Sequence, residues 1–134
     1  MNCYCCSGDT FEACCQPFIQ RKVKPQTAEA LMRSRYSAYA TAAIDYILET
    51  THRKTRNLYS PISIRQWAIA STWLKLEVLS TIAGGINDTK GKVEFKAFFQ
   101  GSNKESQVHH EHSNFVKEKG EWFFVDGVVL GTKY

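Results

Sequence analysis

All five cysteines of this 134-residue chain lie between positions 3 and 15. A disulfide framework usually spreads its cysteines so that they join distant segments, and an odd number within one short loop cannot all pair internally. Thiolates that a short loop brings together are instead the usual donors of a metal site. Between the two groups of cysteines, Ser7-Gly8-Asp9-Thr10 supplies the required turn chemistry. The sequence therefore predicts a small cysteine-ligated metal module at the N-terminus.

The spacing of the cysteines favours zinc, which takes four soft ligands in a tetrahedron and leaves no open position for a catalytic water when all four come from the protein. Cys3-Tyr4-Cys5-Cys6-Ser7-Gly8, followed by Phe11 and Cys14-Cys15, resembles the SEC-C motif, the zinc-binding element known from the tail of the SecA translocase. The resemblance implies the following zinc ligands: Cys3, Cys5, Cys14 and Cys15.

The chain departs from the motif at Tyr4, which is usually proline, and at Cys6, which is usually glycine. A Cys3-x-x-Cys6 pair is also an ordinary zinc spacing, so Cys6 is either a ligand or a free thiol. Ser7-Gly8 falls where the motif expects it only if Cys5 is the ligand. Reduced thiols without a metal, or a redox role for Cys6, are the alternatives.

Composition limits what the rest of the chain can be. With 134 residues, 43% of them hydrophobic, the chain can form one ordinary core but not two full-sized domains. It has neither the ~20 uninterrupted apolar residues of a membrane span nor the start of a signal peptide, so we expect a cytoplasmic protein. The formal net charge of +4 falls to about +2 with one zinc and four thiolates, which argues against nucleic acid as a partner.

Helical patterns dominate the first half of the chain. Residues 16–26 contain two prolines and little periodicity, and are interpreted as a connector. Thr27 is a suitable N-cap for the first helix, and Ser63 followed by Gln66 has the capping-box spacing for the third helix, in which Trp67 faces inward. The predicted helices cover about residues 27–41, 43–50 and 63–71.

The hydrophobic period then changes from 3.6 to 2, which indicates strands. Leu74, Leu76 and Val78 alternate with charged residues, and Glu118-Lys119-Gly120 is a hairpin turn between the last two strands. The predicted strands cover about residues 74–78, 93–99, 107–117 and 121–129. Helices followed by antiparallel strands predict an α+β fold, with helices on one face of a curved sheet and a pocket between them.

Leu31-Met32-Arg33-Ser34-Arg35-Tyr36-Ser37-Ala38-Tyr39, soon after a SEC-C motif, resembles the bacterial YchJ family. Val93–Ala97, His110-Glu111, Gly120-Glu121-Trp122 and Asp126-Gly127 follow in the family's order, so the resemblance covers nearly the whole chain. It implies an NTF2-like cone, in which helices and a curved antiparallel sheet enclose a cavity, with a small zinc knuckle before it, but no particular activity. We therefore expect an N-terminal module over residues 1–20 and a cone over residues 21–134.

Several side chains of the cone are candidates for chemistry in the cavity. The residues that could do chemistry are Arg33, Arg35, Tyr36, His109, His110, Glu111, His112 and Asp126. The five candidates for a catalytic role among them are Arg33, Tyr36, His110, Glu111 and Asp126. Strand alternation places His110 and His112 on one face and His109, Glu111, Ser113 and Phe115 on the other. Phe115 indicates that the face with Glu111 is the inner one, unless a bulge reverses the pattern.

Glu111 admits two interpretations. In an apolar cone a carboxylate can have a raised pKa and act as a general base, with an imidazole as its partner. Alternatively, Glu111 forms an ion pair with Arg33 or Arg35 and fixes the position of the helix on the sheet.

Three functional hypotheses follow from the sequence. The first is a binding or adaptor protein, in which the zinc knuckle presents a surface to a protein partner and the cone holds a small ligand. The second is a hydrolase or isomerase with Glu111 or Asp126 as the base inside the cone and Arg33 or Tyr36 orienting an anionic substrate. The third is a metal or redox sensor with Cys6 as the reactive thiol.

Overall fold

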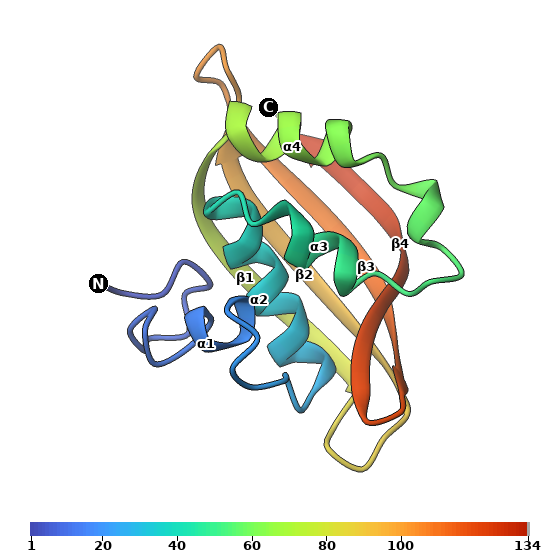
Figure 1. Ribbon diagram of the computed structural model, residues 1–134. Helices are drawn as coiled ribbons and strands as arrows, with labels where there is room; N and C mark the ends of the chain where they lie inside the picture. Colours follow the sequence, from blue (N-terminus) through green and yellow to red (C-terminus); the bar gives the residue numbers. More distant parts are fainter. Residues whose placement is uncertain (134) are drawn as a thin grey trace.

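The computed structural model describes residues 1–133 and confirms the α+β fold (Figure 1). The helices are α1 (Gln16–Ile19), α2 (Ala28–Ala40), α3 (Ile44–Glu49), the 3-10 helix η1 (Arg56–Leu58) and α4 (Pro61–Ala70). The strands are β1 (Thr72–Ala83), β2 (Lys90–Gln100), β3 (Ser106–Glu118) and β4 (Glu121–Lys133). The sheet is antiparallel in the order β1-β2-β3-β4. Within residues 1–133, no helix has both the length and the apolar composition needed to cross a membrane.

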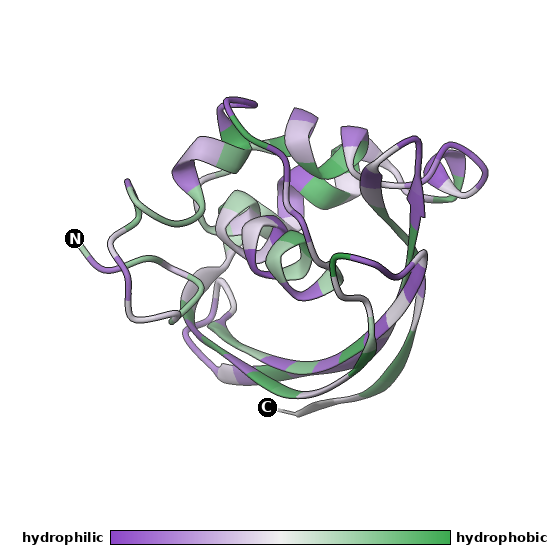
Figure 2. Cartoon of the chain, turned by 90° about the horizontal axis from the view of Figure 1, so that it is seen from below, coloured by the Kyte–Doolittle hydropathy of each residue, from purple (hydrophilic) through white to green (hydrophobic). Residues whose placement is uncertain are grey.

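The sheet curves around the helices, and α2 lies inside its concave face (Figure 2). Register slips accompany this curvature in β1, between Trp73 and Lys75 and between Val78 and Ser80. Such bulges bend a strand and increase its twist. The first slip removes Leu74 from the alternating inner pattern predicted for it, and this residue is 49% exposed.

The helix starts follow from local capping chemistry. The Oγ1 atom of Thr27 accepts a hydrogen bond from the backbone N–H of Ala30, which confirms the predicted cap of α2. The predicted cap of the last helix was three residues too late, because Ser60 caps α4 by accepting from the N–H of Ser63. Pro61 is the reason, since proline at the first helical position fixes φ for the helix and needs no partner for an N–H. The segment predicted as a connector contains the one-turn helix α1.

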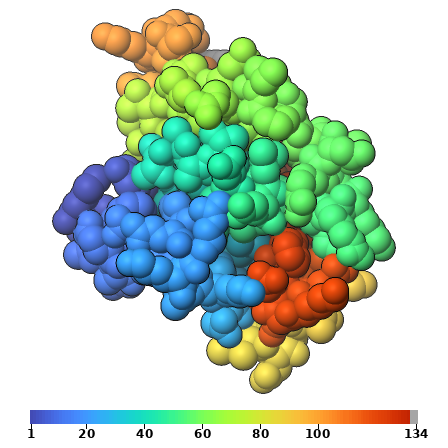
Figure 3. Space-filling view, in the orientation of Figure 1, coloured from blue at the N-terminus to red at the C-terminus, as the bar shows by residue number. Residues whose placement is uncertain are grey.

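The core has two parts that meet at α2. The smaller part joins α2, α3 and α4 around the fully buried Ile47. The larger part lies between α2 and the inner face of the sheet, and three cysteines of the N-terminal module belong to it: Cys3, Cys5 and Cys15. The N-terminal segment therefore packs against the cone and contributes to its core, as its close contact with the helices also shows (Figure 3).

Candidate metal cluster and ligand cavity

Four cysteine sulfurs form a cluster beside α2. The Sγ atoms of this group lie within 4.8 Å of one another: Cys3, Cys5, Cys14 and Cys15. Metal–sulfur bonds of ~2.3 Å in a tetrahedron separate neighbouring sulfurs by ~3.8 Å. The Sγ atom of Cys14 lies 3.7 Å from that of Cys5 and 3.9 Å from that of Cys15. The cluster therefore has the donor set and the spacing of a tetrahedral metal site.

The loop between the two cysteine pairs has the geometry that the resemblance requires. The N–H of Cys3 donates to the carbonyl of Asp9, and the N–H of Cys6 donates to the carbonyl of Cys3, which forms a tight turn. Cys6 has a φ of +63°, in the left-handed region where glycine is favoured, and the SEC-C motif usually has glycine at this position. Its exposed thiol lies outside the group of four. This geometry favours the register with Cys5 in the cluster.

Charge in the cluster requires a cation if all four thiols ionise. A hydrogen bond from Cys15, together with hydrogen bonds from Ser7 and Cys3, outweighs burial and lowers the pKa of Cys5 to about 4. Burial and the nearby charge of Cys5 raise the pKa of Cys14 to about 11, despite a hydrogen bond from Ser7. One thiolate is thus stabilised by its neighbours and opposes the ionisation of the others. A bound divalent cation would supply the missing positive charge.

Arg33 attaches the cluster to α2. Its Nη1 donates to the carbonyl oxygen of Cys5 at 2.7 Å, and its Nε donates to Glu29 at 2.9 Å. The interpretation of Arg33 as a cavity residue is therefore wrong. Two residues correspond to ~200° around a helix, so Arg33 and Arg35 point to opposite sides of α2.

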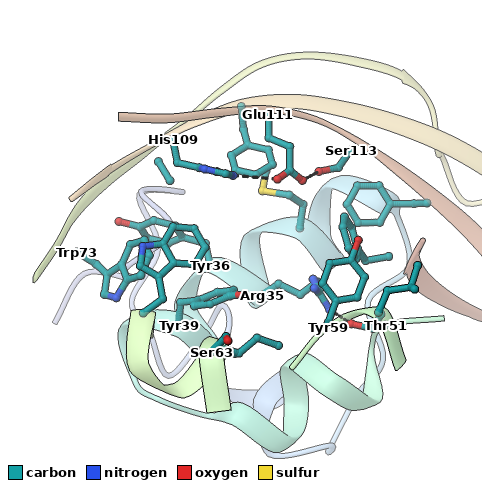
Figure 4. A pocket seen from close by; sticks show the side chains of 18 of the residues that line it. Arg35, Tyr36, Tyr39, Thr51, Tyr59, Ser63, Trp73, His109, Glu111 and Ser113 are labelled. Carbon is teal, nitrogen blue, oxygen red and sulfur yellow. Dashed lines mark hydrogen bonds and ion pairs between the residues drawn. The ribbon is translucent and has the colours of Figure 1, made fainter. Parts of the chain in front are cut away.

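A cavity of about 430 Å³ lies between the inner face of the sheet and the helices (Figure 4). Aromatic side chains form a large part of its wall, among them Tyr36, Tyr39, Tyr59, Trp67, Trp73 and Phe95. Polar side chains lie among them, including His109, Glu111 and Ser113 from β3 and Arg35 from α2. This size and this mixture of apolar walls with a few polar groups are typical of small-molecule sites.

Glu111 is held by its neighbours on β3 and β4. Its carboxylate accepts hydrogen bonds from Nε2 of His109 at 2.8 Å and from the hydroxyl of Ser113. Gly127 makes room for it, because a Cβ atom at this position would lie 2.7 Å from the carboxylate carbon. Burial alone would raise the pKa of Glu111, but these hydrogen bonds and the charges of His109 and Arg35 lower it overall. The prediction of a raised pKa is therefore wrong.

Arg35 occupies the other side of the cavity. Its Nη1 donates to the carbonyl oxygen of Ile47 and to the hydroxyls of Thr50 and Thr51. Its guanidinium carbon lies 4.6 Å from the centroid of the Phe124 ring. Desolvation lowers the pKa of this guanidinium from its usual value.

Glu111 does not form the ion pair with Arg33 or Arg35 that the sequence suggested as an alternative. Among the side chains that the structure describes, Arg35 has no carboxylate within ion-pair distance. The carboxylate and the guanidinium therefore lie in the same cavity without neutralising each other directly.

The family model described as YchJ, middle NTF2-like domain, matches residues 27–127. The chain belongs to the YchJ family. It is 45% identical over 128 residues to a UPF0225 protein of Haemophilus influenzae strain PittEE, an alignment that covers 96% of this chain and 78% of that protein. A UPF0225 protein of Geobacter sulfurreducens is 42% identical over 125 residues, which cover 93% of this chain and 77% of the relative.

Two solved structures of SEC-C motif proteins have the same fold as this YchJ-family chain. The solution structure from Rhodopseudomonas palustris has a TM-score of 0.88 and 42% identity, and the match covers 98% of this chain and all of the other. A crystal structure from Psychrobacter arcticus has a TM-score of 0.77 and 33% identity, and the match covers 96% of this chain and 77% of the other. The resemblance to an NTF2-like cone with an N-terminal SEC-C motif is confirmed.

Two candidate residues of the YchJ-family chain lie outside the cavity. His110 is on the outer face of the sheet, where its Nε2 is 2.7 Å from a carboxylate oxygen of Glu94. Asp126 is exposed there and accepts a hydrogen bond from Asn114 at 2.7 Å. Strict alternation from the buried Phe124 would point Asp126 inward, but a register slip between these two residues turns it outward. The interpretation of His110 and Asp126 as cavity residues is wrong.

Of the five candidates, Glu111 and Tyr36 line the cavity. Tyr36 is buried, and desolvation raises the pKa of its hydroxyl. His109 also lines the cavity, although it was not one of the five candidates; the alternation along β3 had already placed it on the same face as Glu111. That alternation was the signal that could have identified it.

Proposed function

We propose that this YchJ-family protein binds a small planar anion, of the aromatic carboxylate class, in the cone cavity. The observation that supports this most strongly is the cationic Arg35 in an aromatic cavity without a carboxylate partner among the described side chains. A second part of the proposal is that zinc in the four-cysteine cluster has a structural role.

The charge of Arg35 favours an anionic ligand. A cation removed from water is costly unless a counter-ion or further hydrogen bonds compensate it. Glu111 does not serve this purpose directly, since its carboxylate is held by His109 and Ser113 on its own strand. All three hydrogen bonds of Arg35 to described residues use Nη1, which leaves Nε and Nη2 as donors. A carboxylate accepts two parallel hydrogen bonds from such a guanidinium edge.

The aromatic wall favours a planar ligand. Trp67 and Trp73 have ring centroids 5.2 Å apart, and Tyr39 lies 5.2 Å from the first and 5.6 Å from the second. Rings that contact one another edge to face hold each other in fixed orientations. A flat aromatic ligand could contact these rings without a large loss of side-chain entropy on binding.

Trp67 and Trp73 also provide the means to test the proposal by fluorescence. We expect 2-naphthoate to quench the tryptophan emission saturably, and the matched neutral 2-naphthamide to bind at least tenfold more weakly. Arg35→Met should remove this preference, whereas Arg53→Met, which changes an exposed arginine outside the cavity, should keep it. Equal affinity for the two probes in the unmodified protein, or no saturable quenching, would count against the proposal.

The zinc proposal rests on the four sulfurs and their spacing. Elemental analysis of protein purified without added metal should find one zinc per chain. Cys14→Ser should lose this zinc and Cys6→Ser should keep it, because the exposed thiol of Cys6 lies outside the group of four. Zinc retained in Cys14→Ser, or lost in Cys6→Ser, would contradict the assigned ligands. Thiolate ligands also favour a reducing compartment, and we place the protein in the cytoplasm on this ground.

A protein partner at the N-terminal module is the second candidate function. Residues 6–10 are all exposed, and the hydrogen bond from Cys3 to Asp9 and the bridge between Asn2 and Thr10 hold this loop in place. An ordered exposed loop is a suitable contact surface. If the loop binds a partner, a protein that crosslinks to the unmodified chain should no longer crosslink to an Asp9→Lys variant with full metal content. Identical crosslinking by both would exclude this role for the loop.

A further inference from the structure

We infer that His109 is a general base in the cavity, oriented by Glu111, and that the protein removes a proton from carbon in a small planar substrate bound there. The inference rests on the proposed ligand cavity and adds a reaction to it. It differs from the sequence-based hypothesis in its roles, because the imidazole is the base and the carboxylate is the positioning group.

The contacts of His109 fix its tautomer and its ring. Its Nε2 lies 2.8 Å from an oxygen of Glu111, and a carboxylate can only accept, so Nε2 carries a hydrogen. In the neutral imidazole the lone pair is then on Nδ1. Among residues 1–133, no hydrogen bond occupies Nδ1. The ring packs against Trp67 and Phe95, with centroid distances of 5.2 and 6.2 Å.

Glu111 is arranged to remain charged beside His109. The hydroxyl of Ser113 donates to its second oxygen, and the missing side chain of Gly127 leaves the space that the carboxylate occupies. An ionised carboxylate stabilises the imidazolium that forms when the base takes a proton, and keeps the ring in the reactive orientation. The lowered pKa of Glu111 is consistent with this role.

Arg35 can stabilise the negative charge that appears on the substrate. It projects from α2 on the other side of the cavity from Glu111 (Figure 4). Positioned cationic donors in a cavity that excludes water are among the strongest means of stabilising a developing anion. A substrate between β3 and α2 would lose its proton on the side of His109 and carry the resulting charge toward Arg35. Isomerisation and elimination are the reaction classes that need only these two groups.

A ring-opening elimination provides a direct test with 5-nitrobenzisoxazole, a planar aromatic probe. His109 takes the proton from C3, the C–H electron pair forms the nitrile bond, the N–O bond breaks, and the oxygen leaves as a coloured phenolate. We expect saturable turnover by the unmodified protein. His109→Gln should lower kcat at least ~100-fold, the usual contribution of a general base. His110→Gln is the matched control, because the neighbouring histidine lies on the outer face of the same strand, and its kcat should be unchanged.

Glu111→Gln tests the positioning role. We expect its kcat to fall about tenfold with an unchanged KM, since the substitution removes the charge that stabilises the imidazolium and leaves a side chain of similar size. Glu94→Gln removes the corresponding carboxylate beside His110 and should have no effect. A purely structural role for Glu111 would instead change KM and kcat together, or neither.

Separate measurements distinguish the failure of this inference from the failure of the proposed function. No turnover above that of His109→Gln, whatever the probe concentration, overturns the general base. Full turnover in a His109→Gln protein that is folded by circular dichroism and has its metal overturns it as well. Binding of 2-naphthoate without turnover would leave the ligand cavity standing, and loss of both would remove both proposals. Inhibition of turnover by 2-naphthoate would place the reaction in this cavity.

Discussion

The metal cluster and the cavity differ in the sequence separation of the residues that form them. The cluster takes its four sulfurs from positions 3–15 and needs only one tight loop. The cavity takes Arg35 from α2, Glu111 from β3 and Phe124 from β4, so its geometry depends on the register of the sheet. A site formed by a short segment can be identified from spacing alone, whereas a site formed by distant segments depends on every bulge between them.

Helix α2 connects the two regions. Arg33 on one side of it donates to the carbonyl of Cys5, and Arg35 on the other side lines the cavity. Three cysteines of the cluster also belong to the core beneath this helix. A metal in the cluster would therefore fix α2 on the sheet, and with it the position of Arg35.

The largest expected effect is that of removing the metal. Chelation, or the substitution Cys15→Ser at a residue that is 1% exposed, should lower the free energy of unfolding by ~4 kcal/mol or more, the contribution of a ligand present far above its dissociation constant. Affinity for 2-naphthoate should fall as well, because α2 carries Arg35. Urea unfolding and fluorescence titration measure the two quantities, with Cys6→Ser as the control. Unchanged stability after complete metal removal would show that the two regions are independent.

Substitutions of the two arginines on α2 would separate the regions. Arg33→Gln should lower the free energy of unfolding by ~1.5–3 kcal/mol, the range for a hydrogen bond from a charged group, and speed metal loss to a chelator. Its affinity for 2-naphthoate should not change. Arg35→Gln should keep its metal and bind 2-naphthoate at least ~tenfold more weakly, equivalent to ~1.4 kcal/mol. Equal effects of both variants on both readouts would contradict the assignment of the two side chains to separate sites.

Gly127→Ala would disturb the cavity without affecting the cluster. The new methyl group would contact the Glu111 carboxylate, and such overpacking costs ~1–3 kcal/mol. We expect lower stability in urea, reduced turnover of 5-nitrobenzisoxazole and full metal content. Gly131→Ala is a matched control on the same strand, because a Cβ atom there has no neighbour within 4 Å. Equal stability of the two variants would refute the close packing of Glu111 against β4.

The sequence was sufficient for the order of the elements and for the inner face of β3. Helical periodicity, the change to alternation and the Thr27 cap are local properties, and the structure confirms them. Phe115 correctly marked the inner face of β3, because the register between β2 and β3 has no slip that would reverse it.

The errors arose where a local pattern was interrupted. A slip after Phe124 turned Asp126 outward, and a slip after Trp73 exposed Leu74. Pro61 moved the start of α4 ahead of the capping box at Ser63. Bulges depend on how neighbouring strands pair, so the pattern within one strand does not contain them.

The smallest expected effect is in the acid stability of the cavity. The folded pKa of Glu111 is below its ordinary value of 4.5, so the unfolded chain binds this proton at a higher pH than the folded one. The stabilisation is therefore complete above the unfolded pKa and is lost as pH falls through the folded pKa. Between about pH 5 and about pH 3 the unmodified protein should lose more free energy of unfolding than Glu111→Gln, as urea titrations at each pH would show. Glu105→Gln, which changes an exposed glutamate, should follow the unmodified profile. A Glu111→Gln profile parallel to that of the unmodified protein would mean that the hydrogen bonds from His109 and Ser113 do not favour the ionised carboxylate. The cavity would then have no charged group to position His109, whereas beside the cluster Glu29 still accepts a hydrogen bond from Arg33.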